Sequence, residues 1–245
     1  MVALVLLPGL DGTGHLFADF VAALPSGLEV IVAHYPTDKP LSYADLEPIA
    51  RNFLPLNQEY FLLGESFSGP LAITIAATAP PRLRGLILCC SFARNPFPLF
   101  AGFRRLLGVL PVADAPLSLL SYFLMGRFST AGLRMTLKNT LSLVTADVLR
   151  QRARAVLAVD VSDSLAIIKM PVLYLRATED RIVPPSSSQL VAALATQTKI
   201  VDLLGPHFLL QVLPSAAAAV VANFMGLVTP GSHPLPQKKE THGRY

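Results

Sequence analysis

Short apolar runs alternate along the chain with longer stretches in which apolar residues recur at helical spacing. The run at 86–90 is continuous and apolar, as expected of a β-strand that is covered on both faces. Strands that alternate with helices imply right-handed crossovers and therefore a parallel sheet. The runs predict six strands, at residues 2–7, 29–34, 60–64, 86–90, 171–175 and 199–204.

The stretches between these runs predict helices. Ser42 precedes one of them, and we interpret it as an N-cap, because its hydroxyl can accept a hydrogen bond from a backbone N–H of the first turn. Pro70 lies in the first turn of another helix, where a missing N–H costs little. The predicted helices span residues 15–24, 42–54, 71–79, 186–195 and 216–227.

The alternation stops between residues 93 and 160. This segment contains several prolines and then Leu, Phe and Met at helical spacing, which predicts a helical insertion that forms a cap or lid. The insertion divides a core made of residues 1–92 and 161–228, and the polar residues 229–245 are predicted to form a flexible tail. In open parallel sheets, binding sites form beyond the carboxyl ends of the strands.

The composition is apolar: 52% of the 245 residues are hydrophobic and 15% are charged, with a mean hydropathy of +0.52. No segment reaches the ~18 uninterrupted apolar residues of a membrane helix, so stable membrane insertion is not expected. Residues 2–7 follow no cationic region and are interpreted as a buried strand rather than a signal peptide. The net charge of +4 forms no basic stripe, which argues against nucleic-acid binding.

Cys89 and Cys90 are the only cysteines. Neighbouring residues on a strand point to opposite faces, so we predict two buried thiols rather than a disulfide, in a reducing, cytoplasmic compartment. Cysteine and histidine residues show no metal-ligand spacing, and the glycine-rich loop at 8–14 matches neither the dinucleotide nor the Walker phosphate-binding pattern. Neither a metal nor an organic cofactor is predicted.

Residues 64–69, Gly-Glu-Ser-Phe-Ser-Gly, join a predicted strand to a predicted helix. A serine at such a sharp turn, flanked by small residues, is typical of a nucleophile elbow, written G-x-S-x-G in its common form. The turn holds the Ser66 hydroxyl clear of the sheet, near a helix N-terminus that favours developing negative charge. Ser68 stands where the second glycine usually is, and Gly69 follows it.

An activated serine needs a base, and the base needs an acid that orients it. Asp180 follows the strand at 171–175, and His207 follows the strand at 199–204. Both positions lie just past strand ends, on the same edge of the sheet as Ser66. The order Ser66, Asp180, His207 is the order in which this architecture carries a catalytic triad.

Each assignment has rivals. Asp160 and Asp163 are alternative acids, but they precede the strand at 171–175 and are expected to lie at its wrong end. His15 and His34 are alternative bases. Three fitting residue types at three strand ends favour the triad over any of these.

The reaction also needs donors for an oxyanion. We predict the backbone N–H of Phe67, directly after the nucleophile, and the backbone N–H of Leu10, in the loop after the first strand. Backbone donors are rigid and need not reorganise as charge develops.

These segments resemble the α/β-hydrolase family over residues 1–227. Residues 6–12, Leu-Leu-Pro-Gly-Leu-Asp-Gly, resemble its oxyanion loop with Pro8 in place of a histidine, and residues 64–69 resemble its elbow. The chain looks similar to small esterases that include the pimeloyl-carrier-protein methyl ester esterases, and the loop and elbow also resemble plastid phytyl-ester acyltransferases. The resemblance implies an all-parallel, six-stranded sheet, because the family's usual first two strands are absent.

The expected function is that of a serine carboxylesterase acting on a small-molecule ester with a short to medium acyl chain. The insertion is predicted to supply an apolar acyl pocket, with Phe97, Leu120, Phe123 and Leu124 as substrate-binding residues. Three alternatives stay open: an acyltransferase or thioesterase with the same triad, a receptor-like member that binds ligand without turnover, and a surface-active lipase. The natural substrate and the oligomeric state are left open.

Overall fold

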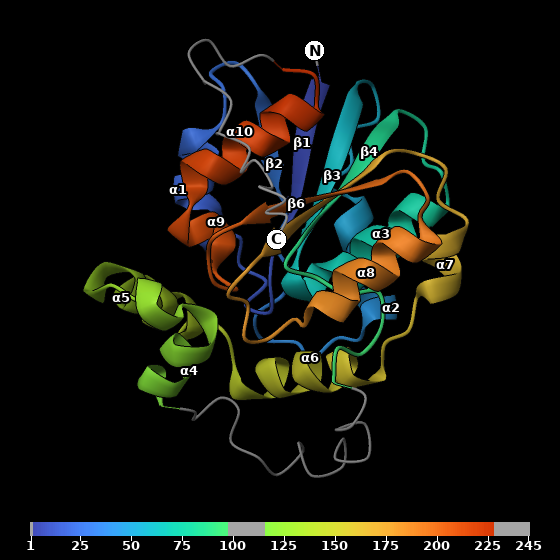
Figure 1. Cartoon of the computed structure of the whole chain (residues 1–245). Coiled ribbons are helices and arrows are strands. Elements are labelled where there is room, and N and C mark those ends of the chain that lie inside the picture. Colours follow the sequence, from blue (N-terminus) through green and yellow to red (C-terminus); the bar gives the residue numbers. More distant parts are fainter. Residues whose placement is uncertain (1, 98–115, 228–245) are drawn as a thin grey trace, which may run out of the picture.

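The computed structural model describes residues 2–97 and 116–227. Its centre is a six-stranded parallel sheet in the order β2-β1-β3-β4-β5-β6 (Figure 1). All six predicted strands are present, with ends that differ from the predicted ones by three residues or fewer. They are β1 (Val2–Leu7), β2 (Glu29–Val32), β3 (Glu59–Glu65), β4 (Leu83–Cys89), β5 (Val172–Ala177) and β6 (Thr198–Leu203).

Helices cover both faces of this sheet (Figure 1). Each face has its own apolar core, formed with the helices packed on it. On one face lie α1 (Ala18–Ala23), α9 (Leu209–Val212) and α10 (Pro214–Phe224). On the other lie α2 (Tyr43–Arg51), α3 (Gly69–Ala77), α7 (Ser162–Ala166) and α8 (Pro185–Leu194).

Strand β1 shows why the apolar runs are continuous. Leu4 and Leu6 enter the core beneath α1 and α10, whereas Val5 and Leu7 enter the core beneath α2 and α3. All four side chains are fully buried. Successive strand residues point to opposite faces, so a strand covered on both faces must be apolar at every position.

The predicted start of α2 is confirmed. Ser42 Oγ accepts a hydrogen bond from the Asp45 backbone N–H, and the Asp45 carboxylate accepts one from the Ser42 N–H at 2.9 Å. This reciprocal capping box satisfies two donors that the first turn would otherwise leave free. The short helices α7 and α9 were not predicted, because four or five residues are too few to show a helical period.

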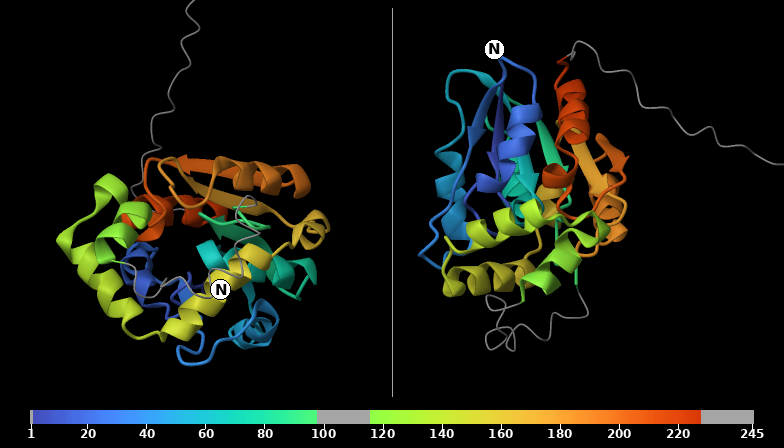
Figure 2. Two further views of the ribbon diagram at one scale, coloured as in Figure 1. Left: turned by 90° about the horizontal axis from the view of Figure 1, so that it is seen from below. Right: turned by 90° about the vertical axis from the view of Figure 1, so that its left-hand side faces the viewer.

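The segment between β4 and β5 is helical, as predicted, in the part that the structure describes. It contains α4 (Leu117–Leu124), the 3₁₀ turn η4 (Gly126–Phe128), α5 (Ala131–Leu141) and α6 (Ala146–Ala158). These elements lie across the end of the sheet where the strands finish (Figures 1 and 2). The division into core and lid, residues 1–92 with 161–228 and 93–160, stays a prediction, and the predicted tail at 229–245 lies outside the described residues.

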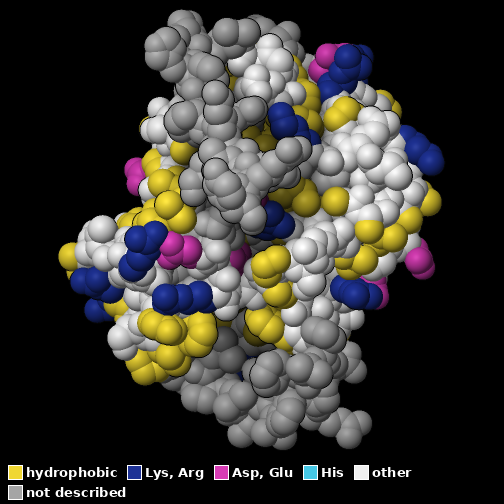
Figure 3. All heavy atoms as spheres, in the orientation of Figure 1, with side chains coloured by type: hydrophobic (Ala, Val, Ile, Leu, Met, Phe, Trp, Pro, Cys, Tyr) yellow, Lys and Arg dark blue, Asp and Glu magenta, His cyan; other side chains and the backbone are white. Residues whose placement is uncertain are grey.

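Hydrophobic side chains gather on the outer surface of α4 and α5 (Figure 3). The large exposed ones in this region are Leu119, Tyr122, Phe123, Met135 and Leu143. Within residues 2–97 and 116–227, no helix combines the length and apolarity that crossing a membrane requires.

The predicted orientation of the two cysteines is wrong. Cys89 and Cys90 are both buried free thiols, but they enter the same core, beneath α1, α9 and α10. The strand ends at Cys89, and Cys90 has a left-handed backbone with φ +47°. This conformation breaks the alternation of side chains on which the prediction depended.

Candidate active site

The turn at Ser66 has the geometry of an elbow. Strand β3 ends at Glu65, Ser66 adopts φ +46°, and a 3₁₀ turn, η2 (Ser66–Ser68), leads into α3. A left-handed serine is strained. Gly64 is required before it, because a Cβ there would lie 2.8 Å from the carbonyl oxygen of Ser68. The strand and the helix approach too closely for any side chain at this position.

The structure also explains why serine stands at position 68, where the elbow pattern usually has its second glycine. Ser68 is fully buried, and its hydroxyl bonds to the Tyr35 hydroxyl at 2.8 Å and donates to the carbonyl oxygen of Pro8. The position that has no room for a side chain is Gly69, where a Cβ would lie 1.7 Å from Ser91 Oγ. The serine therefore joins the elbow to the loop after β1.

Two carbonyl groups of the elbow are held by side chains from other elements. Ser91 Oγ donates to the Ser66 carbonyl at 2.6 Å, and the Tyr43 hydroxyl donates to the Phe67 carbonyl at 2.8 Å. The Tyr43 ring stacks on Phe67 with ring centroids 4.7 Å apart. Phe67 is the second residue of a helical turn, so its N–H has no partner within that turn.

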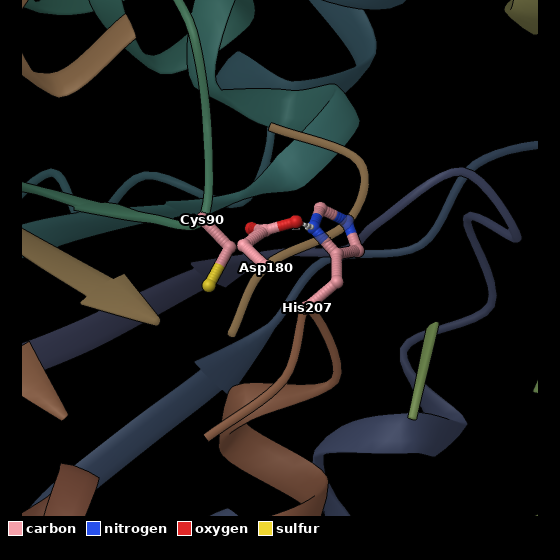
Figure 4. Close-up of side chains that lie close together, drawn as sticks. All are labelled: Cys90, Asp180 and His207. Atoms are coloured by element: carbon pink, nitrogen blue, oxygen red, sulfur yellow. Dashed lines mark hydrogen bonds and ion pairs between the residues drawn. The ribbon is translucent and has the colours of Figure 1, made fainter. Parts of the chain in front are cut away.

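Ser66, His207 and Asp180 form one hydrogen-bonded line. Ser66 Oγ lies 2.9 Å from His207 Nε2, and His207 Nδ1 lies 2.9 and 3.0 Å from the two carboxylate oxygens of Asp180. Figure 4 shows the Asp180 carboxylate directed at the imidazole. Because a carboxylate only accepts, Nδ1 carries the hydrogen and Nε2 is left to accept from the serine.

Asp180 is itself held by the backbone. Its Oδ1 accepts from the N–H groups of Ile182 and Val183, each at 2.8 Å. The side chains of Asp180 and His207 are each only 5% exposed. Burial lowers the pKa of His207, but the charge and hydrogen bond of Asp180 and the charge of Glu65 oppose it, and the net pKa is raised.

The rival residues lie elsewhere. His15 is exposed, and the His34 ring packs edge-on against Phe53 at 5.0 Å. The expectation that Asp160 lies at the far end of the sheet is wrong, because it forms a β-bridge with Arg94 just after β4 ends. Its carboxylate accepts from the backbone N–H of Ser162 at 3.0 Å. The Asp160 carboxylate thus accepts a hydrogen bond from the backbone of its own turn, whereas the Asp180 carboxylate bonds to His207.

The loop after β1 forms a tight turn that is closed by a hydrogen bond from the Gly12 N–H to the Gly9 carbonyl at 3.0 Å. Gly12 has φ +70°, a conformation that glycine adopts without strain. Leu10 occupies the centre of this turn. Its N–H is the oxyanion donor predicted from the sequence, and that role stays a prediction.

Arg152, on α6, holds this loop from outside. Its Nη1 donates to the carbonyl oxygens of Leu10 at 2.9 Å and Asp11 at 2.7 Å, and its Nη2 donates to the Pro36 carbonyl at 2.9 Å. The residue is 1% exposed. A Cβ at Gly12 would lie 2.4 Å from Nη1, so glycine is also required by the arginine.

Sequence reasoning missed Arg152. The signal that would have found it is the buried stripe of α6, which comprises Val148, Leu149, Arg152 and Leu157. An arginine in an otherwise apolar stripe predicts a buried guanidinium with several acceptors. The acceptors themselves come from loops more than 110 residues away in the sequence.

Comparison with protein families gives one match that spans most of the chain. The model described as "Alpha/beta hydrolase family" matches residues 4–223. This chain belongs to the α/β-hydrolase family. The resemblance seen in the sequence is confirmed at the level of the family, and such membership supports hydrolase activity in general. A comparison with curated proteins gave no significant match.

Solved structures share the fold of this α/β hydrolase. A hydrolase from Pseudomonas aeruginosa PA01 superposes with a TM-score of 0.76 at 20% identity, covering 91% of this chain and 89% of that one. A lipase-esterase related protein from Clostridium acetobutylicum gives 0.75 at 17% identity, with 91% and 94% covered. A thermophilic esterase from Thermogutta terrifontis gives 0.74 at 18% identity, with 92% and 89% covered.

The four predicted substrate-binding residues of this α/β hydrolase differ in their burial and in the residues that they contact. Leu120 and Leu124 pack in a small apolar cluster with Leu16 and Phe208, beside His207. Phe123 is 42% exposed, and Phe97 is half-buried in the segment after β4. The helical spacing of apolar residues in the insertion also makes Phe100, Phe103, Leu106 and Leu107 candidates for the pocket, and these four lie outside the described residues.

One group of side chains in the described residues has the composition of a metal site. The ligand atoms of Cys90, Asp180 and His207 lie within 4.8 Å of one another. In Figure 4 the Cys90 sulfur points away from the imidazole, and Asp180 is bonded to His207 Nδ1. A metal there would have to break that bond, so the arrangement fits an acid–base pair better.

Proposed function

We propose that this protein is a serine carboxylesterase that hydrolyses esters with short to medium acyl chains. The observation that carries the proposal is the hydrogen-bonded line from Ser66 Oγ through His207 to Asp180. The serine stands on a strained turn at the carboxyl end of β3, where the family places its nucleophile.

The proposed reaction has two halves. The Ser66 hydroxyl gives its proton to His207 Nε2 as Oγ attacks the ester carbonyl, and the resulting oxyanion accepts hydrogen bonds from the N–H groups of Leu10 and Phe67. The imidazolium then protonates the leaving alcohol, and an acyl-enzyme remains. Water gives a proton to His207 as its oxygen attacks the acyl carbonyl. The imidazolium then returns this proton to Ser66 Oγ as the bond between Oγ and the acyl carbon breaks and the acid leaves.

The electrostatics of His207 suit this role. The base must be neutral to accept the serine proton, and its pKa is raised above the ordinary histidine value. Activity is therefore expected to rise with pH and to level off once the imidazole is neutral. Asp180 stabilises the imidazolium as it forms.

The triad is tested by substitution and labelling. An organophosphonate should label Ser66 once per chain, and Ser66→Ala should abolish turnover. Asp180→Asn should lower kcat by about 10⁴-fold, because asparagine holds the wrong imidazole tautomer. Asp163→Asn, an exposed carboxylate on α7, is the matched control and should leave kcat unchanged. Full activity in Ser66→Ala, or damage from the control, would overturn the assignment.

The chain-length preference follows from the apolar cluster of Leu120 and Leu124 beside His207. Each buried methylene contributes roughly 0.8 kcal/mol, so kcat/KM should rise over the first few acyl carbons and fall once the pocket is full. Leu124→Trp should move the optimum to shorter esters, while Leu143→Trp, an exposed control, should not. An optimum that keeps rising to long chains, or a jump in rate at an oil–water interface, would indicate a lipase.

Product analysis and a comparison of substrates separate the remaining alternatives. If a second alcohol added to the reaction receives most of the acyl group, the product indicates an acyltransferase. Faster turnover of thioesters than of matched esters would indicate a thioesterase. Retention of ligand without turnover would indicate a receptor-like member.

A further inference from the structure

Glu65 is a buried carboxyl group for which the proposed reaction has no use. It is the last residue of β3, directly before the nucleophile, and is 6% exposed. Burying a carboxylate is costly unless hydrogen bonds compensate for the lost water. Its contacts therefore indicate whether it has a function.

The first contact is with the loop after β1. A Cβ built at Gly9 would lie 3.5 Å from Glu65 Oε2, so the carboxyl group packs directly against the Gly9 backbone, which lowers the pKa of Glu65. Gly9 immediately precedes Leu10, whose N–H is the proposed oxyanion donor. The carboxyl group thus supports this loop on the side of the elbow, while Arg152 holds its Leu10 and Asp11 carbonyls.

The second contact is with the helix that follows His207. Gln211 Nε2, on α9, donates to Glu65 Oε1 at 2.9 Å and to the Leu16 carbonyl at 3.3 Å. A carbonyl oxygen only accepts, so the orientation of the amide is set by Leu16, and Glu65 receives a donor. Within the described residues the buried Gln211 Oε1 has no partner. The amide therefore gives up one hydrogen bond in order to donate to the carboxylate.

The charged and titratable groups around Glu65 come from four segments. Asp11 lies in the loop after β1, His207 in the loop after β6, Cys89 at the end of β4, and Gln211 supplies the donor from α9. Burial raises the pKa of Glu65 to about 7, against the effects of Gln211, His207 and Gly9. The negative charge of Glu65 in turn raises the pKa of His207.

We propose that Glu65 is a positioning residue that links the oxyanion loop to the His207 segment and stabilises the His207 imidazolium with its negative charge. The importance of Glu65 for catalysis rests on the proposed esterase function. Its effect on His207 does not, because that effect is electrostatic and is present in the free protein.

Neutralising Glu65 should lower the pKa of His207. In Glu65→Gln the side chain keeps its size and an acceptor oxygen but loses the charge, so the imidazole should be deprotonated at lower pH. We expect a fall of about half a pH unit or more. The rising limb of kcat/KM should move to lower pH by the same amount, since the base must be neutral to act.

The test is a proton NMR titration of the His207 imidazole in the free enzyme, with its resonance assigned by its loss in His207→Gln. Glu59→Gln is the matched control, because Glu59 lies at the exposed start of the same strand. Gln211→Met removes the donor to Glu65 and should lower the His207 pKa in part, with no further fall when combined with Glu65→Gln.

An unchanged His207 pKa in a folded Glu65→Gln variant would overturn the proposal, and so would an equal shift in Glu59→Gln. If Glu65→Gln does not fold, an unchanged His207 pKa in Gln211→Met has the same consequence. The two proposals fail separately: full ester turnover in Ser66→Ala removes the esterase function but leaves the titration result standing.

Discussion

The two sides of the candidate site are held by different kinds of contact. On the side of the proposed oxyanion donors, which we call the oxyanion side, the elbow and the loop after β1 are fixed by buried side chains, namely Ser68 with Tyr35 and Arg152 with three backbone carbonyls. On the acid–base side, the Asp180 loop meets the insertion through exposed groups. Arg127 Nε lies 3.0 Å from both carboxylate oxygens of Glu179, and these side chains are 63% and 33% exposed.

This difference indicates which end of the insertion is firmly attached. A buried charge-assisted hydrogen bond contributes more than an exposed ion pair, whose typical value is about 0–1 kcal/mol. Arg181 adds another exposed contact, donating to the Tyr122 carbonyl at 2.8 Å. We therefore expect α6 to be a fixed support and α4 with η4 to be the part that moves if substrate entry requires opening.

The largest effect is expected from Arg152→Met. This substitution keeps apolar bulk but removes the Arg152 donors from the buried Asp11 carbonyl and the partly buried carbonyls of Leu10 and Pro36. The free energy of unfolding should fall by about 3 kcal/mol. Since the oxyanion loop is then less well positioned, kcat should fall roughly 10- to 100-fold with a smaller change in KM. Urea denaturation and steady-state kinetics measure the two effects.

Arg154→Met on the same helix is the matched control, because Arg154 is exposed. It should change stability by no more than about 0.5 kcal/mol. Equal effects of the two substitutions would show that α6 tolerates the loss of its buried anchor and would remove the contrast between the two sides.

A pH-dependent effect of similar size is expected at Glu65. Its folded pKa of about 7 lies above its ordinary value of 4.5, so the folded state binds the proton more tightly than the unfolded chain. The associated stability is fully present below about pH 4.5 and is lost as the pH rises to about 7. The stability of the wild type relative to Glu65→Gln should therefore fall over this range, by roughly 3 kcal/mol at most.

Thermal unfolding of both proteins at steps from pH 4.5 to 8.5 gives the difference directly. Groups other than His207 titrate equally in the two proteins, so their contributions cancel, and the His207 pKa measured by NMR in each protein gives the contribution of that residue. If the difference in stability between the two proteins is the same from pH 4.5 to 8.5, Glu65 does not change its protonation in that range. The oxyanion side would then contain no carboxyl group with a raised pKa.

The smallest effect is expected from Arg127→Gln, on the acid–base side. Loss of this exposed pair with Glu179 should change stability very little, because solvent screens the two charges, and the change should be smaller still in high salt. Turnover should change by about twofold or less. Stopped-flow measurement of substrate binding would show whether the substitution speeds entry, as expected if α4 and η4 open.

Combining Arg127→Gln with Arg152→Met sharpens the comparison. The two contacts share no partner, so their effects on stability should add to within about 0.5 kcal/mol. A clear departure from additivity would show that the insertion responds as one rigid unit, and the proposed division between a fixed and a moving end would be wrong.

The sequence was sufficient for the strands, for the helices that pack on the sheet apart from α7 and α9, and for the candidate triad. Apolar runs such as 86–90 and the capping box at Ser42 depend on short-range patterns, and these survive folding. Ser66, Asp180 and His207 were found because parallel strands bring their carboxyl ends to one edge, whatever the details of packing. The catalytic roles of these residues remain to be tested.

Only the tertiary structure showed how the site is supported. The hydrogen bonds of Arg152 and Gln211 join residues more than 110 positions apart, and no local pattern specifies such partners. The left-handed backbone at Cys90 likewise depends on the end of β4 rather than on residue type. Hydrophobic periodicity records burial along each element, whereas the pairing of buried polar groups is decided when distant segments meet.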